Sequence, residues 1–334
     1  MLELRDVTRP LGRDPILARA TLDFPTDTPT AVLGLSAPQR EAFLKLLAGA
    51  EKPQSGSVRL GGRDVVQVRR EKGGIVRVPA GGEKVSGQRV GKLIGQDAAS
   101  RVRLAGKLDA KVSDLDLDQR LRLSIAIARS GRPSLILLDA PGVELERDIR
   151  ARFVADLRTM LAETGAVVVL AAGSADEAHG LGGRVVVLDR GSVVQAGPAE
   201  EVFAHPANLR AALATSHPAL NTLAMSGREG RGVLSDGSSF QPPEGVCLPD
   251  GPCTLAFRPD DTSLERQGAG CLRFVVRAAG EESLGGRRFV RVTFAGASWL
   301  TPQPAAAPPP GMMLNAFIDR ERLMVFDGEG KAAN

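Results

Sequence analysis

The residues that could carry chemistry begin in a turn between a strand and a helix near the start of the chain. Residues 31–62 read as an apolar strand, a turn, an amphipathic helix, a Pro/Ser/Gly turn and a short strand. This order is typical of a phosphate-binding loop, in which backbone N–H groups surround an anion, a lysine reaches the phosphates and a hydroxyl binds Mg²⁺. The turn keeps the first glycine of such a loop but has no lysine, and its sequence is Gly34-Leu35-Ser36-Ala37-Pro38-Gln39-Arg40-Glu41-Ala42.

The other positions of this loop carry residues that bind phosphate poorly. Counted from Gly34, the second loop glycine is replaced by Gln39, the lysine by Arg40, and the hydroxyl pair by Glu41 and Ala42. An arginine fork is not equivalent to a compact ammonium. Glu41 would place a carboxylate where phosphate and Mg²⁺ bind, and the proline in the turn removes one N–H donor. The loop therefore predicts a turn without a ligand, with a nucleotide contact by Arg40 as the alternative.

The elements that position this loop alternate between strands and helices over the first two thirds of the chain. Such alternation predicts an α/β domain with a largely parallel sheet, and continuous Val/Ile/Leu runs are expected where strands are covered on both faces. The expected strands are 31–33, 75–78, 135–138, 167–170 and 184–188. The expected helices are 40–48, 119–130, 146–163, 175–181 and 198–203.

The C-terminal third has a different composition and pattern. Residues 216–249 are rich in Ser, Gly, Pro and Asp, which predicts a linker with a little strand. Five later segments alternate like short strands, and this spacing favours a small OB-like barrel: 253–257, 272–277, 288–294, 312–318 and 323–326. We therefore expect an ATPase-like domain at 1–215, a linker at 216–249 and a β domain at 250–334.

Composition excludes several classes of protein. Of the 334 residues 43% are hydrophobic and 25% are charged, with a net charge of +4, which is ordinary for a globular protein and gives little reason to expect nucleic-acid binding. The longest apolar run, 166–172, is far shorter than the roughly 20 residues that cross a bilayer. Three cysteines and three histidines lack the spacing of a metal site, so buried free thiols are expected. These features predict a cytoplasmic protein that is peripheral to the membrane at most.

Several segments together resemble a known family. They are LLAGAEKPQSGSV, LDQRLRLSIAIARS, LILLDAPGVELE and GSADEAHGLGGRVVVLDRGSVVQAGPAEEVFAHPANL, with FRPDD and EESLGG near the C-terminus. Over nearly its whole length the chain resembles an ATP-binding subunit of an ABC importer, of the sugar or polyol type with a C-terminal TOBE barrel. The resemblance implies a P-loop NTPase-like ABC ATPase domain followed by a small all-β OB-like domain.

The resemblance also implies roles for five positions outside the loop. Leu11 stands where the family stacks an aromatic ring on adenine, and Ala80 stands where it has a glutamine. Asp139 is the retained metal-linked carboxylate, whereas Ala140 replaces the catalytic glutamate and Gly173 replaces the switch histidine. A general base contributes about 10²–10⁴-fold to a rate, so the change at Ala140 alone should cripple hydrolysis. No catalytic residue is therefore expected, and Asp139 is a weak metal ligand at best.

The signature loop, which binds the nucleotide held by a partner ATPase in this family, falls on residues 117–121. Asp118 replaces its serine and Gln119 its first glycine. Asp118 would oppose a phosphate by its charge, and we expect it to cap a helix over 119–130 instead. ATP and Mg²⁺ are thus expected only at an interface shared with a second subunit. The segment between Ala80 and residue 117 is also shorter than the family's helical subdomain, which implies a trimmed or altered docking surface.

These implications favour a catalytically impaired pseudo-ATPase in an importer of the sugar, polyol or glycerol class. It would pair with an active ABC ATPase, dock onto membrane permease subunits at the cytoplasmic face of the inner membrane, and serve a periplasmic solute-binding protein indirectly. Two alternatives stay open. One is a regulatory or scaffold module of the same ancestry that takes no part in transport, and the other is an active ATPase that uses Arg40 in an unusual way.

Overall fold

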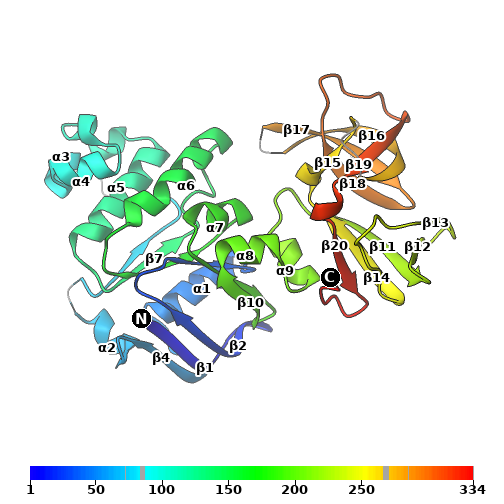
Figure 1. Ribbon diagram of the computed structural model, residues 1–334. Coiled ribbons are helices and arrows are strands. Elements are labelled where there is room, and N and C mark those ends of the chain that lie inside the picture. Colours follow the sequence, from blue (N-terminus) through cyan, green and yellow to red (C-terminus); the bar gives the residue numbers. More distant parts are fainter. Residues whose placement is uncertain (72, 83–86, 266–270, 285, 334) are drawn as a thin grey trace. The chain divides into compact units, whose positions relative to one another are not determined.

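The computed structural model describes residues 1–71, 73–82, 87–265, 271–284 and 286–333. The chain divides into two compact units, Met1–His205 and Pro206–Asn334 (Figure 1). Within the EESLGG segment at 281–286, residue 285 lies outside the described residues.

A six-stranded sheet in the order β10-β9-β3-β8-β7-β6 forms the centre of the first unit. Five of its strands run parallel, and β10 joins β9 as an antiparallel edge hairpin. Every residue of β3 and β8 is buried, as the apolar runs predicted. The strands are β3 (Thr30–Leu33), β6 (Ile75–Val78), β7 (Leu135–Asp139), β8 (Val167–Ala171), β9 (Arg184–Asp189) and β10 (Ser192–Pro198).

A second, antiparallel sheet in the order β2-β1-β4-β5 lies in the same unit. Helix α1 (Ala37–Leu47) shares one hydrophobic core with both sheets, to which it contributes Phe43 and Leu44. Because this apolar face of α1 is buried, the N-terminus of the helix and the loop before it are held against the sheets. The strands are β1 (Leu2–Leu11), β2 (Asp14–Phe24), β4 (Ser55–Leu60) and β5 (Arg63–Asp64).

Helix α6 packs against α5 on one side and against α7 on the other, as Figure 1 shows. In the described part of the segment that looked short in sequence, the helices have only four and six residues, α3 (Val90–Leu93) and α4 (Gln96–Arg101), followed by two 3₁₀ turns. The other helices of this unit are α2 (Val65–Arg69), α5 (Leu117–Ser130), α6 (Arg147–Leu161), α7 (Ala175–Leu181) and α8 (Ala199–Ala204).

The second unit is β-rich, as expected, but contains more strands than the five predicted. Two antiparallel five-stranded sheets, β13-β12-β11-β14-β20 and β15-β19-β16-β17-β18, share a core that includes Trp299. Its elements are α9 (Leu209–Ala214), β11 (Asn221–Arg228), β12 (Arg231–Val233), β13 (Ser239–Phe240), β14 (Gly251–Phe257), β15 (Thr262–Ser263), β16 (Leu272–Leu284), β17 (Arg287–Phe294), β18 (Ala297–Pro302), β19 (Met313–Ile318) and β20 (Met324–Asp327).

The structure differs from the sequence prediction in the residue at which the second unit begins. Residues 216–249, predicted as a linker, contain β11, β12 and β13 and belong to the second unit, which begins at Pro206. Glu229 and Gly230 both have positive φ and form a two-residue hairpin turn between β11 and β12. The polar composition thus reflects tight turns between short strands, and the alternating burial of β11 shows a strand on a core.

Asn221→Ala should destabilise the second unit. The buried Asn221 side chain donates to the Leu300 carbonyl at 2.8 Å and accepts from the Leu300 N–H at 2.8 Å, so alanine leaves both backbone groups without a partner. We expect a loss of about 2–4 kcal/mol in the free energy of unfolding. Urea denaturation followed by the fluorescence of the single tryptophan, which lies in this unit, measures it. The exposed Asn315→Ala is the control, and an equal loss in both variants would contradict this prediction.

Candidate nucleotide site

The candidate site lies at the carboxyl ends of β3, β7 and β8, where open parallel sheets usually bind ligands. The loop from Gly34 to Arg40 follows β3, Asp139 ends β7, and Gly173 follows β8. The register pairs Asp139 with Ala171, so the ends of β7 and β8 lie level with each other. The predicted loop, metal-linked and switch positions therefore do come together.

Gly34 is required by packing, whether or not a ligand binds. Its φ is +92°, and a Cβ on it would lie 1.8 Å from the Leu188 carbonyl oxygen of β9. Only glycine allows this backbone conformation and this close approach together. The retained first glycine of the loop is therefore no evidence for phosphate binding.

The loop also uses its own groups to satisfy its hydrogen bonds. Gln39 Oε1 accepts from the Ser36 N–H at 3.0 Å and from the Ser36 hydroxyl at 2.9 Å. Ser36 is the N-cap of α1, and the amide oxygen of Gln39 takes up an N–H that a phosphate-binding loop would offer to an anion. Pro38 lies in the first turn of α1, where its missing N–H is tolerated.

Arg40 and Asp139 meet in an ion network that includes a residue the sequence reasoning missed. Arg40 Nε lies 3.6 Å from Asp139 Oδ1, and Arg77 Nη2 of β6 lies 2.5 Å from Asp139 Oδ2. The side chains of Arg40, Asp139 and Arg77 are 12%, 15% and 29% exposed. Arg77 could have been noticed as the one charge in an otherwise apolar strand that pairs with β7.

This network changes what Asp139 can do. Both of its oxygens face guanidinium groups, so a divalent cation would have to displace an arginine to reach the carboxylate. Across the described ranges, no cluster of three or more His, Cys, Asp or Glu residues could hold a metal ion. Arg40 and Arg77 would thus compete with a metal ion for the Asp139 carboxylate.

The remaining loop positions serve the helix or the core. Glu41 is exposed and pairs with Lys45 at 3.0 Å, and this hydrogen bond lowers the pKa of the Glu41 carboxyl. Ala42 is buried in the core that α1 shares with the sheets.

Two predicted positions outside the loop also have structural surroundings. Leu11 is half-buried against that core, and Ala80 lies in a turn closed by a hydrogen bond from the Gly82 N–H to the Pro79 carbonyl at 3.0 Å. Neither offers a ring or an amide to a nucleotide.

The positions of the catalytic glutamate and the switch histidine lie directly against each other. Ala140 is fully buried with φ +39°, and its N–H donates to the Ala171 carbonyl at 2.9 Å. A Cβ on Gly173 would lie 3.0 Å from the Ala140 Cβ, closer than real Cβ contacts normally come. A side chain at Gly173 would therefore require neighbouring side chains, such as those of Ala140 and Val143, to move by a few tenths of an ångström.

Glu177 connects the loops that follow β7 and β8, and the sequence reasoning missed it. Its Oε1 accepts from the Gly142 N–H at 2.6 Å and its Oε2 from the Gly173 N–H at 2.7 Å, while the residue is 1% exposed. Burial raises the pKa of the Glu177 carboxyl, and the two N–H donors oppose that shift. The available signal was the spacing Ser174-x-x-Glu177 at the start of α7, typical of a capping box.

The prediction for Asp118 is wrong, because α5 begins at Leu117 and Asp116 caps it. Asp116 Oδ1 accepts from the Gln119 N–H at 2.8 Å, and the Gln119 side chain reaches back to the Asp116 N–H at 3.4 Å. Asp118 lies in the first turn and pairs with Arg122 at 2.8 Å, whose side chain is 5% exposed. The spacing Asp-x-x-Gln selects the earlier aspartate, so Asp118 and Gln119 both have structural partners.

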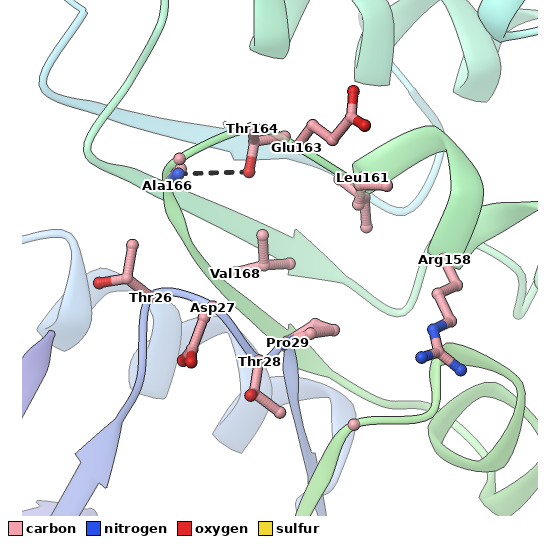
Figure 2. Close-up of a pocket in the computed structure, with 13 residues that line it drawn as sticks. Thr26, Asp27, Thr28, Pro29, Arg158, Leu161, Glu163, Thr164, Ala166 and Val168 are labelled. Atoms are coloured by element: carbon pink, nitrogen blue, oxygen red, sulfur yellow. Dashed lines mark hydrogen bonds between the residues drawn. The ribbon is translucent and has the colours of Figure 1, made fainter.

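A cavity of about 520 Å³ lies at the opposite ends of the strands. Figure 2 shows it between the loop Thr26–Pro29, which leads into β3, and the residues that lead from α6 into β8. Its floor is apolar, with Leu161 and Val168 buried, and its charged residues Asp27, Arg158 and Glu163 are exposed at the rim. The cavity is therefore separate from the loop that begins at Gly34.

Comparisons with known proteins give the fold. No protein-family model matches the sequence. Among solved structures, cbiO1 from Clostridium perfringens, described as part of an ABC transporter complex, matches with a TM-score of 0.53 and 19% identity, covering 61% of this chain and 90% of its own. The chain has the ABC ATPase fold.

Sequence relatives agree with this fold. Over 225 residues the chain is 30% identical to the Fe(3+) ions import ATP-binding protein of Streptomyces avermitilis, covering 62% of this chain and 65% of the relative. Over 305 residues it is 27% identical to a sulfate/thiosulfate import ATP-binding protein of Rhizobium meliloti, covering 83% of this chain and 85% of the relative. The chain is thus similar to the ATP-binding subunits of ABC importers, and it spans just under two thirds of the first of these relatives.

The residues at the nucleotide positions of this ABC ATPase fold do not fit Mg-ATP. The loop N–H at Ser36 is taken by Gln39, the metal-linked Asp139 is paired with two arginines, and no general base stands at Ala140. These three features concern three different requirements of ATP hydrolysis: phosphate binding, metal binding and proton transfer.

Gly34→Ala should destabilise the first unit strongly, because the methyl group would overlap the Leu188 carbonyl. We expect a loss of about 3 kcal/mol or more in the free energy of unfolding, measured by chemical denaturation. Gly61→Ala is the matched control, since Gly61 also has positive φ but has no other group within 4 Å of where its Cβ would stand. That control should lose only about 1 kcal/mol. Equal losses would show that backbone strain alone accounts for the effect.

Glu177→Gln should change how the stability of the first unit depends on pH. A raised pKa means that the folded protein holds the proton more tightly than the unfolded chain, in which glutamate titrates near 4.5. This stabilisation is complete below pH 4.5 and is lost as the pH rises through the raised pKa of the folded state.

Urea denaturation at a series of pH values tests this expectation. The free energy of unfolding of the wild type, measured relative to Glu177→Gln, should fall as the pH rises from about 4.5 to 7. The exposed Glu200→Gln controls for the substitution itself and should change stability at pH 7 by less than about 0.5 kcal/mol. A constant difference between wild type and Glu177→Gln over this range would contradict the prediction.

Proposed function

We propose that the chain is a non-catalytic, ATPase-type subunit of an ABC importer. The observation that carries this proposal is the Arg40–Asp139–Arg77 network, which places two guanidinium groups on the carboxylate that would hold Mg²⁺. The fold around it is retained, with continuous buried strands and a shared core. A retained scaffold without its metal and phosphate ligands supports a role in assembly.

The losses at the other positions support the same proposal. A general base is worth about 10²–10⁴-fold, and residues that act as a unit are not additive, so one loss of this kind already removes most of the rate. Ala140 and Gly173 have no side-chain group that could transfer a proton. The alternative of an active ATPase that uses Arg40 is disfavoured, because Arg40 is directed to Asp139.

The proposed partners follow from the resemblance to importer subunits. They are membrane permease subunits and a second, active ABC ATPase, with a periplasmic solute-binding protein engaged indirectly. ATP and Mg²⁺ would be held only at an interface shared with that second ATPase. No helix in the described ranges is long and apolar enough to cross a membrane. In this proposal the permease provides the attachment at the cytoplasmic face.

The cargo class is a separate part of this proposal. A sugar, polyol or glycerol importer is the class expected from the sequence resemblance and its C-terminal barrel. The relatives described above are named for import of Fe(3+) ions and of sulfate or thiosulfate. The proposed role in assembly rests on the fold and the site, so it does not depend on the class of cargo.

The purified chain should show no ATP hydrolysis above background in the presence of Mg²⁺, because metal, phosphate and base positions are all altered. A steady-state phosphate-release assay measures this, with Asp139→Ala as the control variant. Turnover by the wild type that Asp139→Ala abolishes would refute the proposal and support the active-ATPase alternative.

Affinity purification of the tagged chain from its native membranes tests the assembly role. We expect it to bring down two permease subunits and a second ATPase with an intact phosphate loop. A soluble homodimer without membrane subunits would contradict this and favour the alternative of a regulatory or scaffold module outside transport.

A further inference from the structure

We propose that the Arg40–Asp139–Arg77 network keeps the phosphate loop ordered without any nucleotide, as an internal replacement for the cross-link that phosphate and metal provide. This inference deepens the proposed function and rests on it only in requiring that the site binds no Mg-ATP. The domain would then have one fixed loop conformation, independent of the nucleotide state of the cell.

The network joins three separate elements at one carboxylate. Arg40 comes from the first turns of α1, Arg77 from β6 and Asp139 from the end of β7. Each oxygen of Asp139 faces a different guanidinium group, at 3.6 Å and 2.5 Å. In a nucleotide-binding loop, bound phosphate and Mg²⁺ hold the groups of the loop in place, whereas here side chains of the protein connect the three elements directly.

The network is shielded from water, because all three side chains are less than a third exposed. Arg77 donates a hydrogen bond to Asp139. Arg40 Nε makes a charge contact with Asp139 at 3.6 Å without a hydrogen bond, and Arg40 Nη1 donates to the Leu35 carbonyl at 3.4 Å. Removing one partner from a buried ion pair leaves an uncompensated charge and is strongly destabilising. Without Asp139, both arginines would lose their shared counter-ion, so we expect the loop to be less ordered when this carboxylate is removed.

Glu177 connects two further loops of the site, those that follow β7 and β8. Its two oxygens hold the N–H groups of Gly142 and Gly173, in the loops after β7 and β8. The phosphate loop itself is closed by Gln39 on Ser36. The four segments that a nucleotide would contact are therefore already connected to one another by groups of the chain.

Hydrogen–deuterium exchange on the full chain without nucleotide tests the inference. The backbone amides of Ser36 and Arg40, which donate to Gln39 Oε1 and to the Ser36 carbonyl, should be protected in the wild type, and Asp139→Asn should speed their exchange by about tenfold or more. The control is Arg63→Met, which removes an ion pair with Glu71 whose side chains are about half exposed, and it should leave these amides unchanged. Unprotected amides in the wild type, or equal effects of both variants, would overturn the inference.

A double-variant cycle distinguishes an energetic coupling between Asp139 and Arg77 from a general loss of packing. Asp139→Asn alone should lower the melting temperature by about 4 °C or more. Arg77→Met combined with Asp139→Asn should lower it no further than Asp139→Asn does, because the second change removes one of the two uncompensated arginines. Additive losses would show that the side chains act independently and would overturn the inference.

Adding Mg-ATP at millimolar concentration completes the test. It should change neither the exchange of residues 34–41 nor the melting temperature of the wild type, and added protection would overturn the inference. The outcome is distinct from that of the proposed function. A protected loop in a protein that fails to join a permease refutes the assembly role alone, whereas an unprotected loop in a protein that does join one refutes this inference alone.

Discussion

Charge compensation at Asp139 is the interaction on which the rest of this site depends. A carboxylate at the end of a buried parallel strand is costly unless a cation or hydrogen-bond donors face it. In this chain two arginines do so, one from α1 and one from the neighbouring strand β6. Once both oxygens are matched in this way, the loop before α1 has no need of a metal ion or a phosphate to hold it in place.

The other polar groups of the site also have partners within the chain. Gln39 satisfies the loop N–H, Lys45 pairs with Glu41, and Glu177 satisfies two backbone N–H groups in the loops after β7 and β8. In a working ATPase these backbone donors would face a nucleotide, and a carboxylate at Glu41 would oppose it. Here each of these groups has a hydrogen-bond or ion-pair partner within the chain.

The fold is retained because its determinants are different from those of catalysis. Continuous apolar runs specify the parallel strands, and the apolar face of α1 completes a core with two sheets. Gly34 persists because the β9 backbone leaves no room for a Cβ. Both features serve packing, so the fold around the loop does not require a bound nucleotide.

Much of this could be predicted from the sequence, because local patterns determine local structure. Apolar periodicity placed five of the six strands of the central sheet and five helices of the first unit within a few residues, but it did not place β10, β2 or the short helices α2, α3 and α4. The residue types at the loop, at Ala140 and at Gly173 gave the prediction of an inactive site. The boundary of the second unit was harder, since tight turns have the composition of a linker. The partners of the site were decided only by the tertiary structure. Arg77 lies 62 residues from Asp139 in sequence, and Glu177 lies 35 residues from Gly142. Such pairs have no local signature, because only the pairing of β6 with β7 and the packing of α7 bring their charges and N–H groups within reach.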